Sequence, residues 1–120
     1  MAAKLFGITL DCDDPAVLGE FYRRLAGFEA AYSSDGYVGL SADGGVNIGF
    51  QKVAGYTPPK WPRQEVPQQL HLDFAAGEDL DAAEAEAVAL GATRAPDQPD
   101  PSRWRVMLDP AGHPFCLAKM

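Results

Sequence analysis

The sequence has few cysteines and few cations. Cys12 and Cys116 are the only cysteines among 120 residues, too few for the disulfide framework that stabilises small secreted domains. Ten Lys and Arg stand against 17 Asp and Glu, which gives a formal net charge of −7. Nucleic acids and anionic membranes are bound by basic patches, so this balance disfavours both as partners.

Long apolar runs are also missing. No stretch approaches the roughly 18 consecutive apolar residues of a membrane-spanning helix, and the N-terminus lacks the apolar core of a signal peptide. We therefore expect a cytoplasmic protein. Hydrophobic residues still make up 47% of the chain, enough for one domain with a real core.

The first half of the chain predicts a strand, a helix and further strands. Apolar residues alternate over Lys4–Asp11, which is typical of a strand. Asp14 as N-cap and Pro at the first helical position predict a helix over Pro15–Ala26, which Gly27 ends. Two or three short strands with Gly-containing turns follow within residues 31–50.

The second half repeats this order at an offset of 64 residues, as Gly27 and Gly91 show. A strand is predicted over Gln68–Ala75 and a helix over Leu80–Leu90, with acidic side chains such as Glu84 on its solvated face. One such unit cannot bury both faces of its sheet. Two units can pair, with helices on one side and strands curving around a cleft on the other.

A hairpin is predicted at the end of the chain. The turn Asp109–His113 lies between two apolar runs, and a five-residue loop places Val106 opposite Cys116. Trp104 then shares a face with Val106 and Cys116.

The segment between the halves is rich in proline and contains Trp61. It predicts an extended linker rather than a helix. Trp61 either caps the core or belongs to a lid over a cleft.

The repeat, the final Asp-Pro-Ala-Gly turn and the segment Gln68–Phe74 together resemble the vicinal oxygen chelate superfamily, in particular its small glyoxalase-like proteins. The resemblance implies an α+β fold of two paired βαβββ modules that form a curved sheet with a cleft. It covers a single domain, residues 1–120, with module one at about 1–53, a linker at 54–68 and module two at about 69–120.

The resemblance also implies where a metal would bind. Metal-using members carry four ligands, His or Glu, on the first and last strands of both modules. The matching positions here are Gly7, provisionally Asn47, His71 and Cys116. Gly7 has no ligating side chain, and His plus Cys is short of the three protein ligands usual at a catalytic zinc. We therefore expect no cofactor and no four-ligand metal site.

Other polar residues share the cleft face by alternation, Thr9 and Asp73 among them. Asp73 either holds a polar group of a ligand or pairs with Arg103 or Arg105. His71 is interpreted as a hydrogen-bonding cleft residue rather than a metal ligand, and Cys116 as a small apolar strand residue rather than a nucleophile.

Three functional hypotheses remain. The first is a module that binds a small, partly aromatic, neutral or cationic ligand, with Tyr56 as a further stacking candidate. The second is a lyase, isomerase or dioxygenase with a reduced or atypical metal site, or a metal-free enzyme that uses His71 as acid or base. The third is a dimer with a vestigial cleft. A homodimer is expected in any case. The predicted ligand-binding residues are Thr9, Asn47, Trp61, His71, Asp73, Trp104 and Cys116.

Overall fold

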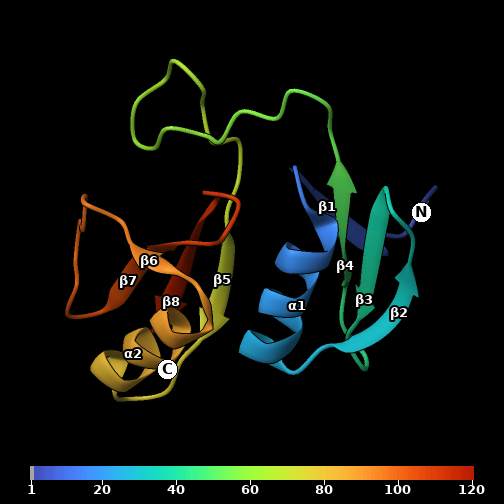
Figure 1. Ribbon diagram of the computed structural model, residues 1–120. Helices are drawn as coiled ribbons and strands as arrows, with labels where there is room; N and C mark the ends of the chain where they lie inside the picture. Colours follow the sequence, from blue (N-terminus) through green and yellow to red (C-terminus); the bar gives the residue numbers. More distant parts are fainter. Residues whose placement is uncertain (1) are drawn as a thin grey trace. The chain divides into compact units, whose positions relative to one another are not determined.

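The computed structural model describes residues 2–120 as an α+β protein with two four-stranded mixed sheets and two helices. The chain divides into two compact units between Tyr56 and Thr57. Both units have the element order β-α-β-β-β (Figure 1), as the repeat predicted. Neither helix within residues 2–120 has the length and apolar character needed to cross a bilayer.

The first unit contains the sheet β1-β4-β3-β2, in which β1 and β4 are parallel and the other neighbours antiparallel. The helix α1 packs against one face of this sheet, and the fully buried Tyr22 stacks on Phe50 at 5.6 Å between ring centroids. The elements are β1 (Gly7–Cys12), α1 (Pro15–Ala26), β2 (Glu29–Ser33), β3 (Tyr37–Ser41) and β4 (Asn47–Lys52).

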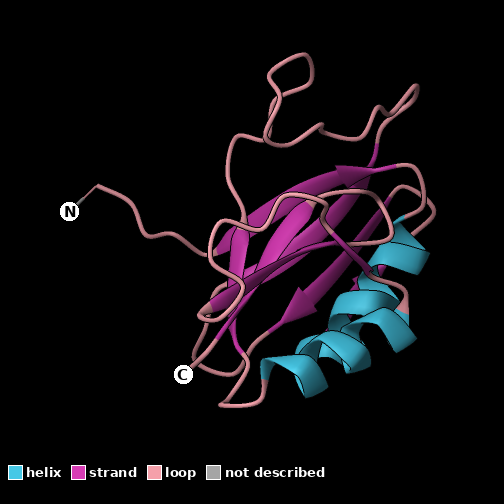
Figure 2. Ribbon diagram, turned by 90° about the vertical axis from the view of Figure 1, so that its left-hand side faces the viewer, coloured by secondary structure: helices cyan, strands magenta, loops and turns pink. Residues whose placement is uncertain are grey.

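The second unit repeats this topology with the sheet β5-β8-β7-β6, in which β5 and β8 are parallel. Its helix α2 also covers one face of its own sheet (Figure 2). Met107, Phe115 and Leu117 are buried there. The elements are β5 (Leu72–Ala75), α2 (Leu80–Leu90), β6 (Thr93–Arg94), β7 (Trp104–Leu108) and β8 (Pro114–Ala118).

Both helices have the predicted bounds, because their ends are fixed locally. The Asp14 carboxylate accepts from the Val17 N–H at 3.3 Å, and the Asp79 carboxylate accepts from the Ala82 N–H at 3.0 Å. Gly27 ends α1 in the left-handed region, at φ 72°. The two aspartate contacts satisfy N–H groups that a helix leaves unpaired in its first turn.

Two predicted strands begin later than expected. β1 begins at Gly7 rather than Lys4, and β5 begins at Leu72 rather than Gln68. The N–H of Asn47 donates to the Phe6 carbonyl at 3.0 Å and so supports the start of β1. The residue at the matching position of β8 is Pro114, which has no N–H to donate. His71 therefore lies just before its strand.

Glu84 corrects a second expectation. Its side chain is only 21% exposed and accepts from both Arg94 and Arg105, at 3.1 Å each, instead of facing solvent. Arg105 also pairs with Asp81 at 2.9 Å. The suggested pairing of Asp73 with Arg105 is therefore wrong, because α2 already supplies the acidic partners of Arg105. The βαβββ module implied the short strand β6, but no residue pattern located it at Thr93–Arg94.

The final hairpin has the predicted register, with Val106 opposite Cys116 and Leu108 opposite Pro114. The buried Asp109 carboxylate accepts from the N–H groups of Ala111 and His113 at 2.9 and 3.0 Å. The turn thus fixes which residues of β7 and β8 share a face.

Candidate functional site

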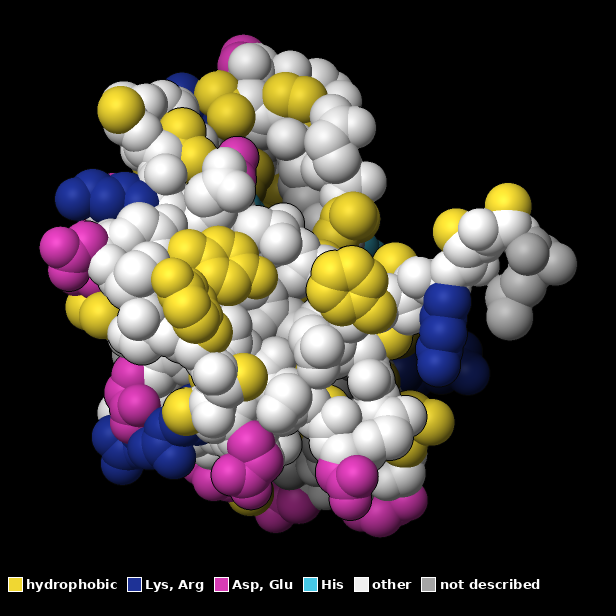
Figure 3. Space-filling view, turned by 90° about the vertical axis from the view of Figure 1, so that its right-hand side faces the viewer, with side chains coloured by type: hydrophobic (Ala, Val, Ile, Leu, Met, Phe, Trp, Pro, Cys, Tyr) yellow, Lys and Arg dark blue, Asp and Glu magenta, His cyan; other side chains and the backbone are white. Residues whose placement is uncertain are grey.

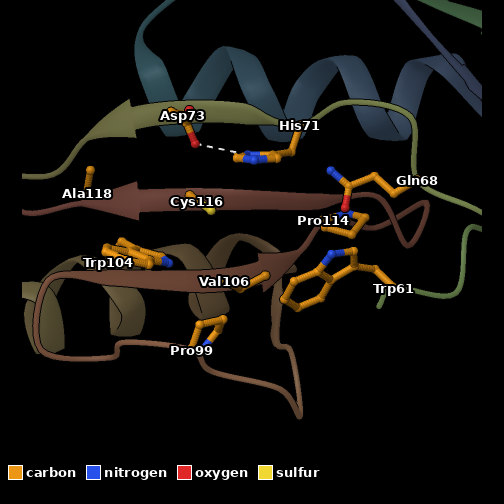
Figure 4. Close-up of a pocket in the computed structure, with 10 residues that line it drawn as sticks. All are labelled: Trp61, Gln68, His71, Asp73, Pro99, Trp104, Val106, Pro114, Cys116 and Ala118. Atoms are coloured by element: carbon orange, nitrogen blue, oxygen red, sulfur yellow. Dashed lines mark ion pairs between the residues drawn. The ribbon is translucent and has the colours of Figure 1, made fainter. Parts of the chain in front are cut away.

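A pocket of about 400 Å³ lies within the second unit. The hairpin register places Cys116 between Asp73 on β5 and Val106 on β7, so three neighbouring strands each present one side chain to it. Arg105, on the opposite face of β7, bonds to α2, so the pocket lies on the face away from the helix. Its lining is Trp61, Gln68, His71, Asp73, Pro99, Trp104, Val106, Pro114, Cys116 and Ala118 (Figure 4).

One side of the pocket carries a carboxylate–imidazole pair. The Nδ1 atom of His71 lies 3.0 Å from the Asp73 carboxylate, and the side chains are 45% and 64% exposed. Figure 4 shows the pair along β5, facing the two indoles across β8. A half-exposed pair of this kind can exchange hydrogen bonds with a bound molecule without a large desolvation cost.

Cys116 forms the floor next to this pair and is 8% exposed. Burial, and then the charge and hydrogen bond of the Asp73 carboxylate, raise the pKa of the Cys116 thiol to about 11. A nucleophilic cysteine needs the opposite, an electropositive setting that favours the thiolate. Here a carboxylate is the neighbour that acts on the sulfur, so the trio is not built as a cysteine nucleophile.

The opposite side of the pocket is aromatic. Trp61 and Trp104 pack against the buried cluster of Ala95, Val106 and Cys116, and Figure 4 shows the two indoles flanking Val106. The loop that carries Trp61 is closed by a hydrogen bond from the Lys60 N–H to the Val66 carbonyl at 2.7 Å. Trp61 thus both packs on the core and lines the pocket.

A glutamine side chain forms hydrogen bonds to the backbone next to this aromatic wall. The Gln98 amide donates to the carbonyls of Ala95 and Val106 at 3.0 and 2.7 Å, and its oxygen accepts from the Val106 N–H at 3.0 Å. Gln98 therefore continues the hydrogen bonding of β7 where no backbone strand is present, next to Pro99 of the lining.

The structure brings five of the seven predicted site residues into this one pocket: Trp61, His71, Asp73, Trp104 and Cys116. Thr9 and Asn47 instead line a separate hollow of about 250 Å³ in the first unit. Sequence reasoning missed four lining residues. Pro114 and Ala118 lie two residues from Cys116 and were accessible to alternation, whereas Gln68 and Pro99 lie in loops that carry no periodic signal.

The hollow in the first unit differs in its floor. Gly39 and Gly49 occupy the positions that correspond to Val106 and Cys116, and a Cβ at Gly49 would overlap the Tyr37 ring. Tyr37, which corresponds to Trp104, therefore lies across the two glycines. Figure 3 shows hydrophobic side chains at the surface on the β2 side of the first unit, where Tyr32 is 60% exposed.

Comparison with known proteins identifies the family. Residues 7–118 match the glyoxalase-like domain. The chain belongs to this glyoxalase-like family. Solved structures of the wider glyoxalase/bleomycin resistance/dioxygenase superfamily share the fold of this glyoxalase-like domain, so the predicted resemblance is confirmed. No curated protein matches the chain.

Three solved structures illustrate the likeness. A glyoxalase/bleomycin resistance protein/dioxygenase family enzyme from Burkholderia phytofirmans PsJN is 22% identical, with 98% of each chain covered and a TM-score of 0.68. A possible glyoxalase from Bacillus cereus is 15% identical, with 98% of this chain and 99% of that chain covered and a TM-score of 0.69. A mutant of the fosfomycin resistance protein FosX from Listeria monocytogenes, complexed with Mn(II) and 1S,2S-dihydroxypropylphosphonic acid, is 18% identical, with 98% and 90% covered and a TM-score of 0.70.

The four-ligand metal site implied by the superfamily does not fit this chain. Asp73 pairs with Cys116 in the second unit as Thr9 pairs with Gly49 in the first. Gly49, not the provisionally assigned Asn47, thus occupies the position of Cys116, and neither Gly7 nor Gly49 has a ligating side chain. The second unit offers more than expected, because Asp73 joins His71 and Cys116 as a third donor.

Proposed function

We propose that this glyoxalase-like domain binds a small, partly aromatic, neutral or cationic molecule in the pocket of its second unit. The observation that carries the proposal is the lining itself. Two indoles face a carboxylate–imidazole pair across a narrow floor, in a cavity of the size that small ligands occupy.

The aromatic preference follows from the wall of Trp61 and Trp104. Flat rings stacked on indoles gain roughly 1 kcal/mol beyond the burial of apolar area. A cation held over an indole gains a further electrostatic attraction to the ring face.

The charge preference follows from the side chains around the cavity. The described lining contains the carboxylate of Asp73 and no Lys or Arg, and the chain as a whole has a net charge of −7. An anionic ligand would find no Lys or Arg to offset its desolvation, whereas an ammonium group can pair with Asp73.

The test compares two probes of similar shape and opposite charge, tryptamine and indole-3-acetate. Calorimetry and ligand-observed NMR with the full chain should show binding of tryptamine and at least tenfold weaker binding of indole-3-acetate. Asp73→Asn should remove most of this difference, while Asp43→Asn, an exposed carboxylate of the first unit, should leave it unchanged.

Aromatic truncations give a second arm. Trp61→Ala should weaken tryptamine binding severalfold, and Tyr32→Ala, which removes an exposed aromatic outside the pocket, should not. If neither Trp61→Ala nor His71→Ala weakens any bound probe, the ligand site lies elsewhere. A preference for the anionic probe would contradict the proposal directly.

A second candidate function is an enzyme with a reduced metal site. The three donors His71, Asp73 and Cys116 favour it, because three protein ligands with an open position are the usual catalytic arrangement of zinc. Turnover of a bound probe that depends on added metal would support this candidate over simple binding.

Homodimer formation stays a prediction, which light scattering at micromolar concentration checks.

A further inference from the structure

We propose that His71, Asp73 and Cys116 form a three-donor site for a thiophilic divalent ion, with zinc as the best fit, entirely within the second unit. The inference goes beyond the binding of an organic ligand. It also differs from the arrangement implied by the superfamily, which draws ligands from both modules.

The geometry brings three different donor atoms together. The imidazole nitrogen of His71, a carboxylate oxygen of Asp73 and the sulfur of Cys116 all lie within 4.8 Å of one another. Neighbouring ligands around a tetrahedral zinc are about 3.5 Å apart, given bonds of about 2.0–2.3 Å. Side-chain shifts of about an ångström would close the set, and the side chains of His71 and Asp73 are 45% and 64% exposed.

The backbone holds the donors at this spacing. Asp73 lies directly opposite Cys116 in the parallel pairing of β5 and β8, and His71 precedes Asp73 by two residues on the same face. The strand register therefore places carboxylate and thiol opposite each other on the sheet. The residue directly before β5 adds the imidazole.

The donor set selects the class of ion. Thiolate and imidazole favour zinc, cobalt and other borderline or soft ions, whereas magnesium, calcium and manganese favour oxygen ligands. Three protein ligands leave a fourth position for a water molecule or a bound substrate.

Cobalt(II) provides the test, because a cobalt–thiolate bond absorbs in the near ultraviolet and reports sulfur ligation without any enzymatic activity. Titration of the purified full chain should give this charge-transfer absorption with a stoichiometry of one per chain. Zinc should displace it, and a tenfold excess of manganese or magnesium should not.

Variants assign the ligands. Cys116→Ser should abolish the charge-transfer band, while His71→Ala should weaken cobalt binding by more than the roughly tenfold to hundredfold that loss of an outer-shell partner costs. Matched controls are Cys12→Ala, which removes the other cysteine, and Asn47→Ala, which removes the polar residue provisionally placed at a ligand position of the first unit. Both should retain the band.

Several outcomes would overturn the inference. They are the absence of the band in the wild-type chain, its persistence in Cys116→Ser, its loss in Asn47→Ala, or displacement by manganese. If Cys116→Ser fails to fold, the exposed His71 and Asp73 variants decide, and unchanged cobalt affinity in both would refute the site. Trp61→Ala should impair tryptamine binding but spare the cobalt band, so failure of the metal site and failure of the proposed ligand site are distinguishable.

Discussion

The two units of this glyoxalase-like domain share topology, strand register and helix caps, but they carry different chemistry on the face of the sheet. Where the second unit has Asp73 and Cys116 opposite each other, the first has Thr9 and Gly49. Where Trp104 stands beside a pocket of about 400 Å³, Tyr37 lies across a hollow of about 250 Å³.

The comparison shows that a few side chains at matching positions distinguish the unit with the larger pocket from the other unit. Gly39 and Gly49 lack side chains, so the Tyr37 ring rests close to the backbone. Val106 and Cys116 carry side chains at the matching positions, and Trp104 packs against the cluster that contains them. The same fold therefore yields one unit in which an aromatic ring lies across the two glycines and one unit with an exposed carboxylate–imidazole pair above a buried thiol.

We expect the largest effect when an aspartate is removed from each of the two five-residue hairpin turns and the free energies of unfolding are compared. Asp109→Ala should lower the free energy of unfolding by about 2–3 kcal/mol, because it removes the buried carboxylate that accepts from the N–H groups of Ala111 and His113. The exposed Asp43 belongs to the corresponding turn of the first unit, and Asp43→Ala should change the free energy by less than about 0.5 kcal/mol. Urea unfolding of both variants measures the difference, and equal effects would refute this account of the turn.

The next prediction concerns Gly49, one of the two glycines across which the Tyr37 ring lies. Gly49→Ala should cost about 1–2 kcal/mol, because the new Cβ overlaps Tyr37 and forces the ring to move. The double variant with Tyr37→Ala should recover part of this cost in a double-mutant cycle. Cys116→Ala at the matching position of the second unit introduces no overlap. Additive effects of the two first-unit substitutions would show that Tyr37 does not press on Gly49.

A smaller loss of stability is expected for a substitution of Gln98, whose side chain bonds to the backbone next to the aromatic wall. Gln98→Glu keeps the acceptor for the Val106 N–H but loses both donated hydrogen bonds, so the free energy of unfolding should fall by about 1 kcal/mol. Gln64→Glu, at an exposed site, is the control. Unfolding curves that coincide for the two variants would rule out the supporting role of Gln98.

The pH prediction concerns the thiol of the pocket. Because the pKa of Cys116 is raised to about 11 from its ordinary value of 9.0, the folded state favours the neutral thiol. Its contribution to stability is therefore present below about pH 9 and is lost as the pH rises through about 11. Iodoacetamide labelling, followed by mass mapping that separates Cys116 from Cys12, should accelerate only toward pH 11. Asp73→Asn should move this acceleration to lower pH, and rapid labelling of the wild-type chain at pH 8 would contradict the expected environment.

The sequence predicted those features that depend on neighbouring residues. Asp14 and Gly27 bound α1 locally, and the turn that starts at Asp109 determines the register of β7 and β8. The true start of β5 could not be predicted, because it depends on Pro114 in a strand far along the chain. The partners of Glu84 were missed for the same reason, since Arg105 lies outside the reach of helical spacing.

The site shows the same division. Alternation correctly grouped His71 with Asp73, and the hairpin register grouped Trp104 with Cys116. Joining the two pairs requires the parallel pairing of β5 with β8, which no local pattern reveals. Thr9 and Asn47 were predicted with them because the cleft was expected to draw on both modules, and in the structure these two residues line a hollow of the first unit.

Backbone amide NMR during a titration with tryptamine tests most directly the central claim that the functional pocket belongs to the second unit. The account predicts that chemical-shift changes concentrate around Trp61, residues 71–73, Trp104 and residues 114–118, while the amides of Gly7, Thr9, Asn47 and Gly49 stay in place. Changes centred on those four residues of the first unit, with the second unit unaffected, would contradict it.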